Sequence, residues 1–299
     1  GGAGDGRGDT DASVGPAAIG GEPGRAGGDG VVFFDFPADR ARQLARMLAS
    51  IDAELWEAEG VGTSPPEVEL VTMTEYDAEF DLPVAFPPTQ PEDTLGEVLS
   101  GAGLTQLRMA ESEKYAHVTY FLNGGREVEF PGELRRIIQS PDVPTYDETP
   151  AMSAVELTDT AIDLVEAEDP DVLVLNYANP DMVGHTGDFD AAVAAVEAVD
   201  REFGRLAAAV RAAGGHLLVT ADHGNADDMG TPDDPHTAHT FAPVPFVSVT
   251  PEGDDGEATV REGGSLIDIA PTLLAVVGVD KPAAMTGESL LIESTDTEE

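Results

Sequence analysis

The sequence predicts an α/β protein in which a parallel sheet is flanked by helices, preceded by the end of a second α/β domain. Short apolar runs alternate with segments whose apolar residues recur at helical spacing. Residues 171–178 are almost continuously apolar, which is typical of a parallel strand buried on both faces. Because strands that alternate with helices are joined by right-handed crossovers, the pattern favours one helix-covered sheet.

The first third of the chain contains one predicted strand-to-helix unit. Residues 1–30 hold twelve glycines and no periodic apolar pattern, so we predict disorder there. Residues 31–36 are predicted to form a strand, and the following segment to residue 48 a helix that Pro37 can begin. A second strand is predicted at 68–73. Residues 81–93, rich in Pro and Phe, are predicted to be an extended linker and the domain boundary.

The rest of the chain supplies the elements of the main sheet. We predict helices at 93–102, 152–166, 189–213 and 266–277, and strands at 107–110, 171–178, 216–220 and 244–249. Ser153 and Glu156 have the spacing of a capping box at the start of the second helix. Residues 113–121 fit a helix or a strand, since periodicity does not decide between them. Gly124 and Gly125 predict a turn.

Acidic residues dominate the composition. The net charge is −43, and only two of the fifteen basic residues are lysines, which together indicate adaptation to high salt. Such a charge argues against binding to nucleic acid or to an anionic membrane. The chain has no cysteine, no signal peptide and no apolar run of the roughly 20 residues that a membrane span needs. We therefore expect a cytoplasmic protein.

Histidines and aspartates gather after the predicted strands, in the segments 179–185, 220–225 and 236–240. In a parallel sheet, ligands bind beyond the carboxyl ends of the strands, which is where the first two segments lie. Asp181 and His185 are four residues apart and would share one face of a helical turn. A helix cap at Asp181 and an ordinary polar role for His185 are the alternative for that pair alone.

Two further pairs point to the same edge of the sheet. Asp222 and His223 follow a strand. Because adjacent side chains point apart, each would supply one ligand to a different metal, or the pair would bridge towards a second ion. His236 and His239 add nitrogen donors from a loop, although a solvated loop explains that pair equally well. Taken together, His and Asp ligands without thiolate fit Mn or Zn better than Ca, and also admit Mg. These residues favour a two-metal hydrolase or phosphoryl-transfer enzyme.

From about residue 31 onward, the sequence resembles the cofactor-independent phosphoglycerate mutases, which do not require 2,3-bisphosphoglycerate and belong to the alkaline phosphatase superfamily. The motifs that carry the resemblance lie at 33–43, 113–119, 123–127, 179–187, 221–225 and 236–240. The resemblance implies an alkaline phosphatase-like fold and interconversion of 3-phosphoglycerate and 2-phosphoglycerate through a phosphoserine. It also implies two divalent ions, with Mn favoured and Mg or Zn as alternatives, and a monomeric complete enzyme.

The same resemblance assigns roles to individual residues. Asp181, His185 and His239 correspond to the ligands of one ion, and Asp222 and His223 to ligands of the other. His236 is then expected to hold the loop rather than to bind an ion. Two further residues are expected to bind substrate, Lys114 at the phosphoryl group and Arg40 at the phosphate or carboxylate of the phosphoglycerate.

The resemblance also implies a division into domains. Residues 31–88 correspond to the end of a phosphotransferase domain that binds substrate, and residues 89–292 to the metal-binding, phosphatase-like domain. Residues 293–299 form an acidic tail.

Two departures from the family pattern affect the expected activity. Pro37 stands where the family usually has an arginine that contacts substrate. The nucleophilic serine and a further metal-binding aspartate of the family precede everything matched here, and residues 1–30 show no counterpart. We therefore expect the chain to represent the C-terminal part of such an enzyme and to be inactive alone. The alternatives are another phosphatase of the superfamily, a phosphopentomutase, or a non-catalytic metal-binding remnant.

Overall fold

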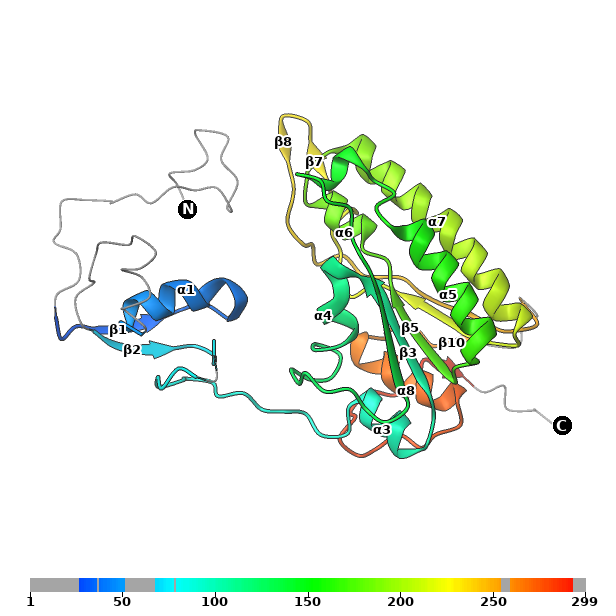
Figure 1. Ribbon diagram of the computed structural model, residues 1–299, viewed down its shortest axis with the longest axis horizontal. Coiled ribbons are helices and arrows are strands. Elements are labelled where there is room, and N and C mark those ends of the chain that lie inside the picture. The colour runs from blue at the N-terminus through cyan, green and yellow to red at the C-terminus, as the bar shows by residue number, and fades with distance from the viewer. Residues whose placement is uncertain (1–26, 37, 52–67, 78, 254–258, 293–299) are drawn as a thin grey trace. The chain divides into compact units, whose positions relative to one another are not determined.

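The computed structural model describes residues 27–36, 38–51, 68–77, 79–253 and 259–292. The predictions for Pro37, for most of residues 1–30 and for the acidic tail 293–299 lie outside these residues. Contacts divide the chain after Thr89 into two compact units, drawn in Figure 1. Among the described residues, no helix combines the length and the apolarity needed to cross a membrane.

The first unit contains the predicted strand-to-helix pattern. β1 (Gly30–Phe33) pairs in parallel with β2 (Glu69–Thr72), and α1 (Ala38–Leu48) lies between them in sequence. Ala41, Ala45 and Leu48, at helical spacing, are buried against Leu70 and Tyr76. The periodicity therefore predicted this element correctly, and α1 begins just after Pro37.

The second unit is organised around three parallel strands. β3 (Gln106–Glu111) pairs with β4 (Glu133–Ile138) on one side and with β5 (Val172–Asn176) on the other. The predicted parallel sheet is thus present, although the sequence did not predict β4. The prediction that β5 is buried on both faces was wrong, because only Val172 is fully buried and the rest of the strand is partly exposed.

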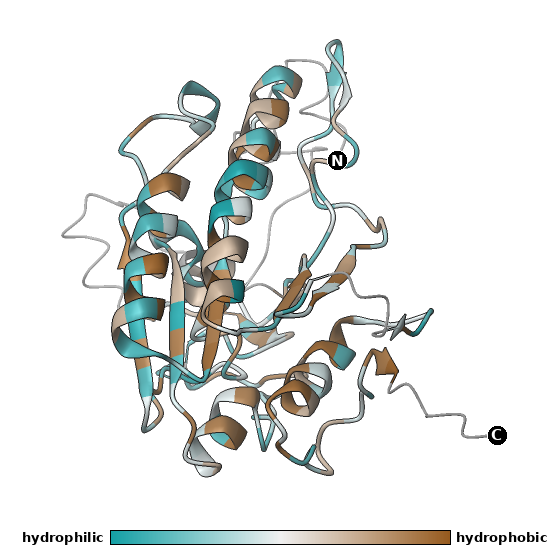
Figure 2. Ribbon diagram, turned by 90° about the vertical axis from the view of Figure 1, so that its right-hand side faces the viewer, coloured by the Kyte–Doolittle hydropathy of each residue, from teal (hydrophilic) through white to brown (hydrophobic). Residues whose placement is uncertain are grey.

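Helices cover both faces of this sheet. On one face α5 (Ala154–Glu168) and α7 (Phe189–Ala212) lie side by side (Figure 1), and Leu157 and Leu206 pack against Leu107 and Met109 of β3. On the other side α3 (Leu95–Gly101) and α8 (Ile269–Val276) share a core with Val172. Hydrophobic and hydrophilic segments alternate along the long helices in Figure 2, as expected for amphipathic helices that each cover a sheet.

The remaining strands form small separate sheets. β6 (Leu217–Thr220) pairs with β9 (Phe246–Val249), and this pair is antiparallel, which corrects the expectation that all the strands would run in parallel. β9 runs back along β6, and the segment between them contains no helical crossover of the kind that a parallel pair requires. Three short elements complete this part: the hairpin β7 (Gly230–Thr231) and β8 (Asp234–Pro235), the pair β10 (Thr259–Val260) and β11 (Leu291–Ile292), and the 3₁₀ turn η3 (Leu266–Asp268).

Two local predictions are settled by the structure. Most of segment 113–121 is helical, because η1 (Ser112–Lys114) runs into α4 (Tyr115–Val118), and residues 119–121 form a turn. Ser153 is the N-cap of α5 as predicted, but the capping box is absent: the Ser153 hydroxyl donates to the Gln139 carbonyl instead. Another short 3₁₀ turn, η2 (Tyr146–Glu148), precedes α5.

Candidate metal centre

Asp181 and His185 lie just beyond the carboxyl end of β5, on and next to the short helix α6 (Asn179–Gly184). Pro180 sits in the first turn of α6, where its missing N–H costs no hydrogen bond. Asp181 follows in the same turn, and His185 is the C-cap residue. Their spacing brings the His185 Nε2 atom to 3.2 Å from Asp181 Oδ1, so the two side chains share one face as the sequence predicted.

His239 completes a nearly equilateral triangle with these two residues. Its Nε2 atom lies 3.3 Å from Asp181 Oδ1 and 3.2 Å from His185 Nε2. Three ligands about 2.1 Å from one ion, at tetrahedral or octahedral angles, are separated by about 3.0–3.4 Å. The separations of the three donor atoms therefore fit a single divalent ion.

A backbone contact fixes the orientation of the His185 ring. Its Nδ1 atom lies 2.7 Å from the Thr237 carbonyl, which makes Nδ1 the protonated nitrogen and leaves the Nε2 lone pair facing Asp181. Histidines that bind metals commonly donate their second N–H in this way. Burial, and then the neighbouring His223, lower the pKa of His239, which favours the neutral imidazole that a metal requires.

His223 approaches the same carboxylate from the segment after β6, with Asp222 beside it. His223 Nε2 is 4.0 Å from Asp181 Oδ1 and 3.7 Å from Asp222 Oδ1, and its ring stacks on that of His239 with centroids 3.7 Å apart. Asp181, His223 and His239 also form a donor set within 4.8 Å. The triangle with His185 is tighter, so it fits one ion better.

Lys114 and Asn225 hold the central carboxylate. The Lys114 ammonium contacts Asp181 Oδ2, and the Asn225 amide donates to Asp181 Oδ1 over 2.8 Å. Burial alone would raise the pKa of Asp181, but Lys114, together with Asn225 and His185, outweighs it and holds that pKa below its ordinary value. Asp181 is therefore a carboxylate, which is the form that binds cations.

Gly184 allows Asn225 to come this close. A Cβ atom at position 184 would lie 2.3 Å from Asn225 Oδ1, a distance that no side chain can occupy without displacing the amide. Asn225 itself is buried, and its Oδ1 has no hydrogen-bond partner among the described residues. The sequence analysis gave Asn225 no role, because spacing alone does not reveal which way an amide side chain points.

The other histidines and Arg40, the second predicted substrate residue, lie in different surroundings. The ring of His236 faces the Asp228 carbonyl at 3.0 Å, so it holds its own loop, and His216 bonds Ser248 across the β6–β9 pair. Burial, and then the charge of Lys114, lower the pKa of His117, while the charge of Asp222 acts in the opposite direction. The sequence did not indicate a role for this histidine. Arg40 lies on α1, in the other compact unit.

Comparison with known proteins places these residues in a recognised group. Residues 32–281 match the family model described as the metalloenzyme superfamily. The chain belongs to the metalloenzyme superfamily. Members bind metal ions, which agrees with the donor triangle around Asp181.

Two similar proteins carry the same name. This chain is 69% identical over 286 residues to the 2,3-bisphosphoglycerate-independent phosphoglycerate mutase of Natronomonas pharaonis, and the match covers 95% of this chain and 56% of the relative. For the mutase of the same name from Halobacterium salinarum the identity is 67% over 285 residues, with the same coverage. The chain therefore spans little more than half the length of these relatives.

A solved structure shares the fold. The phosphoglycerate mutase of Leishmania mexicana, crystallised at low cobalt concentration, superimposes with a TM-score of 0.73 at 30% identity, covering 90% of this chain and 51% of that one. The fold of this metalloenzyme is accordingly that of phosphoglycerate mutases, with an alkaline phosphatase-like α/β sheet.

Proposed function

We propose that this metalloenzyme chain is part of a phosphoglycerate mutase that interconverts 3-phosphoglycerate and 2-phosphoglycerate through a phosphoserine. The observation that carries the proposal is the convergence on Asp181 of the His185 and His239 nitrogens, within 3.3 Å, with Lys114 on its other oxygen. A carboxylate, two imidazoles and an ammonium at one sheet edge suit a phosphoryl group, whose oxygens need both cations and donors.

Asp181, His185 and His239 are proposed to hold one ion, and Asp222 and His223 to contribute to a second. When bound, such ions supply Lewis-acid stabilisation of the transferring phosphoryl group and activation of a hydroxyl nucleophile. The donors are nitrogen and carboxylate oxygen without thiolate, which favours Mn, with Mg or Zn as alternatives. Neighbouring polar groups orient these ligands: the Thr237 backbone carbonyl accepts from His185, and the Asn225 side-chain amide donates to Asp181.

Lys114 is proposed to contact the phosphoryl oxygens. Its side chain is only 8% exposed and is paired with Asp181, so its ammonium is already desolvated and aimed at the donor cluster. In a chain with a net charge of −43, an anionic substrate needs such a local reversal of the field. Arg40 is proposed to bind the phosphate or carboxylate of the phosphoglycerate through its forked donors.

The division into a substrate-binding part (31–88) and a metal-binding part (89–292) belongs to the same proposal, as do a monomeric complete protein and a cytoplasmic location. Adaptation to high salt is supported by the acidic composition. None of these proposals assigns a further residue to the reaction.

The test is an assay of the full-length protein that contains this chain, loaded with Mn²⁺. We expect interconversion of the two phosphoglycerates, and a loss of at least about 100-fold in kcat for Lys114→Met even when Mn²⁺ saturates that variant. Arg136→Gln, an exposed change on β4, is the control. Hydrolysis of p-nitrophenyl phosphate, or turnover of ribose 1-phosphate, without mutase activity would overturn the proposal in favour of a phosphatase or a phosphopentomutase. Mn²⁺ binding without any turnover would indicate a non-catalytic metal-binding protein.

A further inference from the structure

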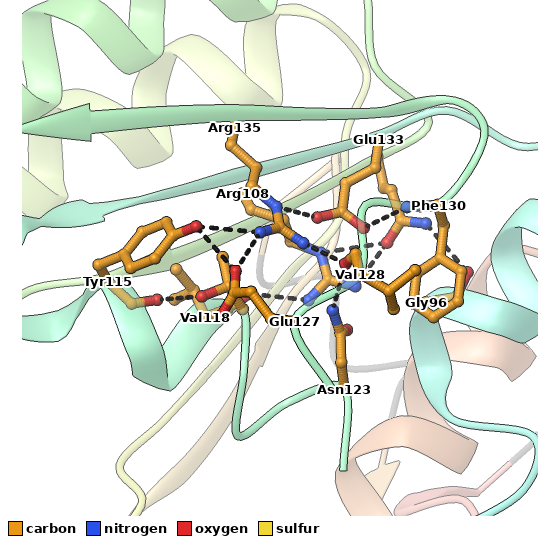
Figure 3. A network of polar contacts seen from close by, with 12 residues as sticks. Gly96, Arg108, Tyr115, Val118, Asn123, Glu127, Val128, Phe130, Glu133 and Arg135 are labelled. Atoms are coloured by element: carbon orange, nitrogen blue, oxygen red, sulfur yellow. Dashed lines mark hydrogen bonds and ion pairs between the residues drawn. The ribbon is translucent and has the colours of Figure 1, made fainter. Parts of the chain in front are cut away.

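Two arginines, Arg108 and Arg135, lie near each other in a network of polar contacts with the segment from Tyr115 to Val118 (Figure 3). Arg108 on β3 and Arg135 on β4 are register partners in the parallel sheet, so their backbones lie about 4.8 Å apart. Arg108 is completely buried, which disfavours its ionised state; the charge of Glu133 opposes this effect, and the charge of Arg135 adds a smaller cost. Placing two like charges together in a protein interior is unfavourable, so this arrangement calls for a specific reason.

Among the described residues, the hydrogen bonds of Arg108 go to neutral acceptors. Its Nε and Nη2 atoms donate to the Gln106 side-chain oxygen, the first at 3.1 Å, and its Nη1 atom donates to the Val118 carbonyl at 3.0 Å. Burial lowers the pKa of Arg108, and the charge of Glu133 offsets only part of that effect. Apolar residues of similar volume often replace buried charged groups at no loss of stability. The buried cation is therefore poorly explained by stability alone.

Arg135 binds a second set of groups around the same segment. Its guanidinium donates to Glu133 at 2.5 Å, and to Glu127 and the Tyr115 hydroxyl at 3.0 Å each. It also contacts the Val128 carbonyl. Arg135 thus connects β4 with the beginning of α4 and with the loop that follows it.

The two arginines hold opposite ends of α4. Tyr115 is the first residue of this four-residue helix and Val118 the last, and Lys114 is its N-cap residue. A helix of one turn is not stable by itself, because nucleation costs more than its single turn of hydrogen bonds returns. Its position must come from tertiary contacts, and Arg108 and Arg135 provide two of them.

We propose that Arg108 and Arg135 are positioning residues that fix α4 and thereby hold the Lys114 ammonium at the Asp181 carboxylate. The proposal rests on the proposed function for the catalytic meaning of Lys114, but the placement of Lys114 can be measured without any reaction. It predicts that loosening either end of α4 releases Lys114 while the rest of the second unit stays folded.

The chain offers a direct probe, because Lys114 and Lys281 are its only lysines. Protein labelled with ¹³C at lysine Cε gives two NMR signals, which a Lys114→Met sample assigns. Lys281 is held independently by the Met285 and Gly287 carbonyls, so its signal reports whether the fold is intact. Spectra of the whole chain are compared for the original protein, Arg108→Gln and Tyr115→Phe, with Arg136→Gln as the matched control on β4.

In Arg108→Gln we expect the Lys114 signal to move at least halfway towards its position in the unfolded chain, with the Lys281 signal unchanged. Tyr115→Phe removes only the hydroxyl that Arg135 binds, and should give a smaller shift in the same direction. If Arg108→Gln does not fold, both signals reach the unfolded positions and Tyr115→Phe decides. A Lys114 signal that stays in place in folded Arg108→Gln, or in Tyr115→Phe where Arg108→Gln does not fold, overturns the proposal.

Adding inorganic phosphate with Mg²⁺ separates this inference from the proposed function. If phosphate leaves the Lys114 signal of the original protein in place, the role of Lys114 in phosphoryl binding fails, while the shifts in the variants still establish positioning. If phosphate moves that signal but neither arginine contact affects it, the function stands and the positioning role is wrong.

Discussion

The Nε2 atoms of His185 and His239 lie 3.2 Å apart, although 54 residues separate them in the chain. One sits at the end of α6 and the other in the loop between β8 and β9, so tertiary structure alone brings them together. Two nitrogens and the Asp181 oxygen at such short separations are best explained as ligands of one ion. The first prediction follows from that triangle.

Replacing His239 with Asn should weaken binding of Mn²⁺ by at least about 100-fold, since even the groups that orient metal ligands commonly contribute 10- to 100-fold. Isothermal titration calorimetry of the chain in molar KCl measures the change. His236→Asn is the matched control, because His236 lies in the same loop but faces the Asp228 carbonyl. Equal losses in the two variants would show that the loop, and not the triangle, determines affinity.

Gly184→Ala tests the contact between Asn225 and Asp181. The new Cβ would have to displace Asn225 Oδ1, which lies 2.3 Å from its position, so the amide would lose Asp181. We expect Mn²⁺ affinity to fall about tenfold, as for other changes to groups that orient a ligand. Gly204→Ala is the control: it lies in α7 with open space at its Cβ, and should instead raise the free energy of unfolding by about 0.5–1 kcal/mol.

The sequence was informative wherever the decisive relationship is local. Asp181 and His185 are four residues apart, and helical geometry alone puts them on one face. The loops after β5 and β6 were expected to converge because parallel sheets gather ligands at one edge. That expectation held for Asp181 and His223, whose side chains lie 4.0 Å apart, even though β6 pairs in the antiparallel sense with β9.

The relationships that escaped prediction depend on contacts distant in sequence. Residues 113–121 gave no clear periodicity because the single turn of α4 is held by Arg108 and Arg135, not by an apolar stripe of its own. The direction of the Asn225 amide depends on the absence of a side chain at Gly184, which lies 41 residues earlier in the chain. Neither dependence leaves a spacing that a reader of the sequence could recognise.

Salt should stabilise the protein strongly. With a net charge of −43, carboxylates repel one another over a Debye length of about 10 Å at 0.1 M salt, but over only about 3 Å at 1 M. We expect the thermal midpoint, followed by circular dichroism, to rise by roughly 10 °C between these concentrations of KCl, equivalent to a few kcal/mol. Equimolar sucrose is the control for effects unrelated to charge. A midpoint insensitive to KCl would contradict the interpretation of the acidic surface as an adaptation to salt.

The buried carboxyl of Glu111 should make stability depend on pH in the neutral range. Glu111 is fully buried at the end of β3, where its Oε1 atom accepts the Ser153 backbone N–H at 3.0 Å and its Oε2 atom has no partner among the described residues. Burial raises its pKa from 4.5 to about 7, against the lowering effect of that N–H. The folded protein thus prefers the neutral acid.

The sign of the effect follows from this preference. Below about pH 4.5 Glu111 is protonated in both the folded and the unfolded chain. Between about pH 4.5 and 7 it ionises in the unfolded chain but stays protonated in the folded one, so the unfolded state is stabilised relative to the folded state. Relative to Glu111→Gln, which mimics the neutral acid, the original protein should therefore lose about 3 kcal/mol of unfolding free energy as the pH rises through this window, and no more above it. Urea unfolding of both proteins at constant KCl, from about pH 5 to pH 8, measures the difference. Glu166→Gln, an exposed change on α5, is the control and should show no such trend. If the difference in unfolding free energy between Glu111→Gln and the original protein stays constant with pH, Glu111 is ionised in the folded state and the prediction is wrong.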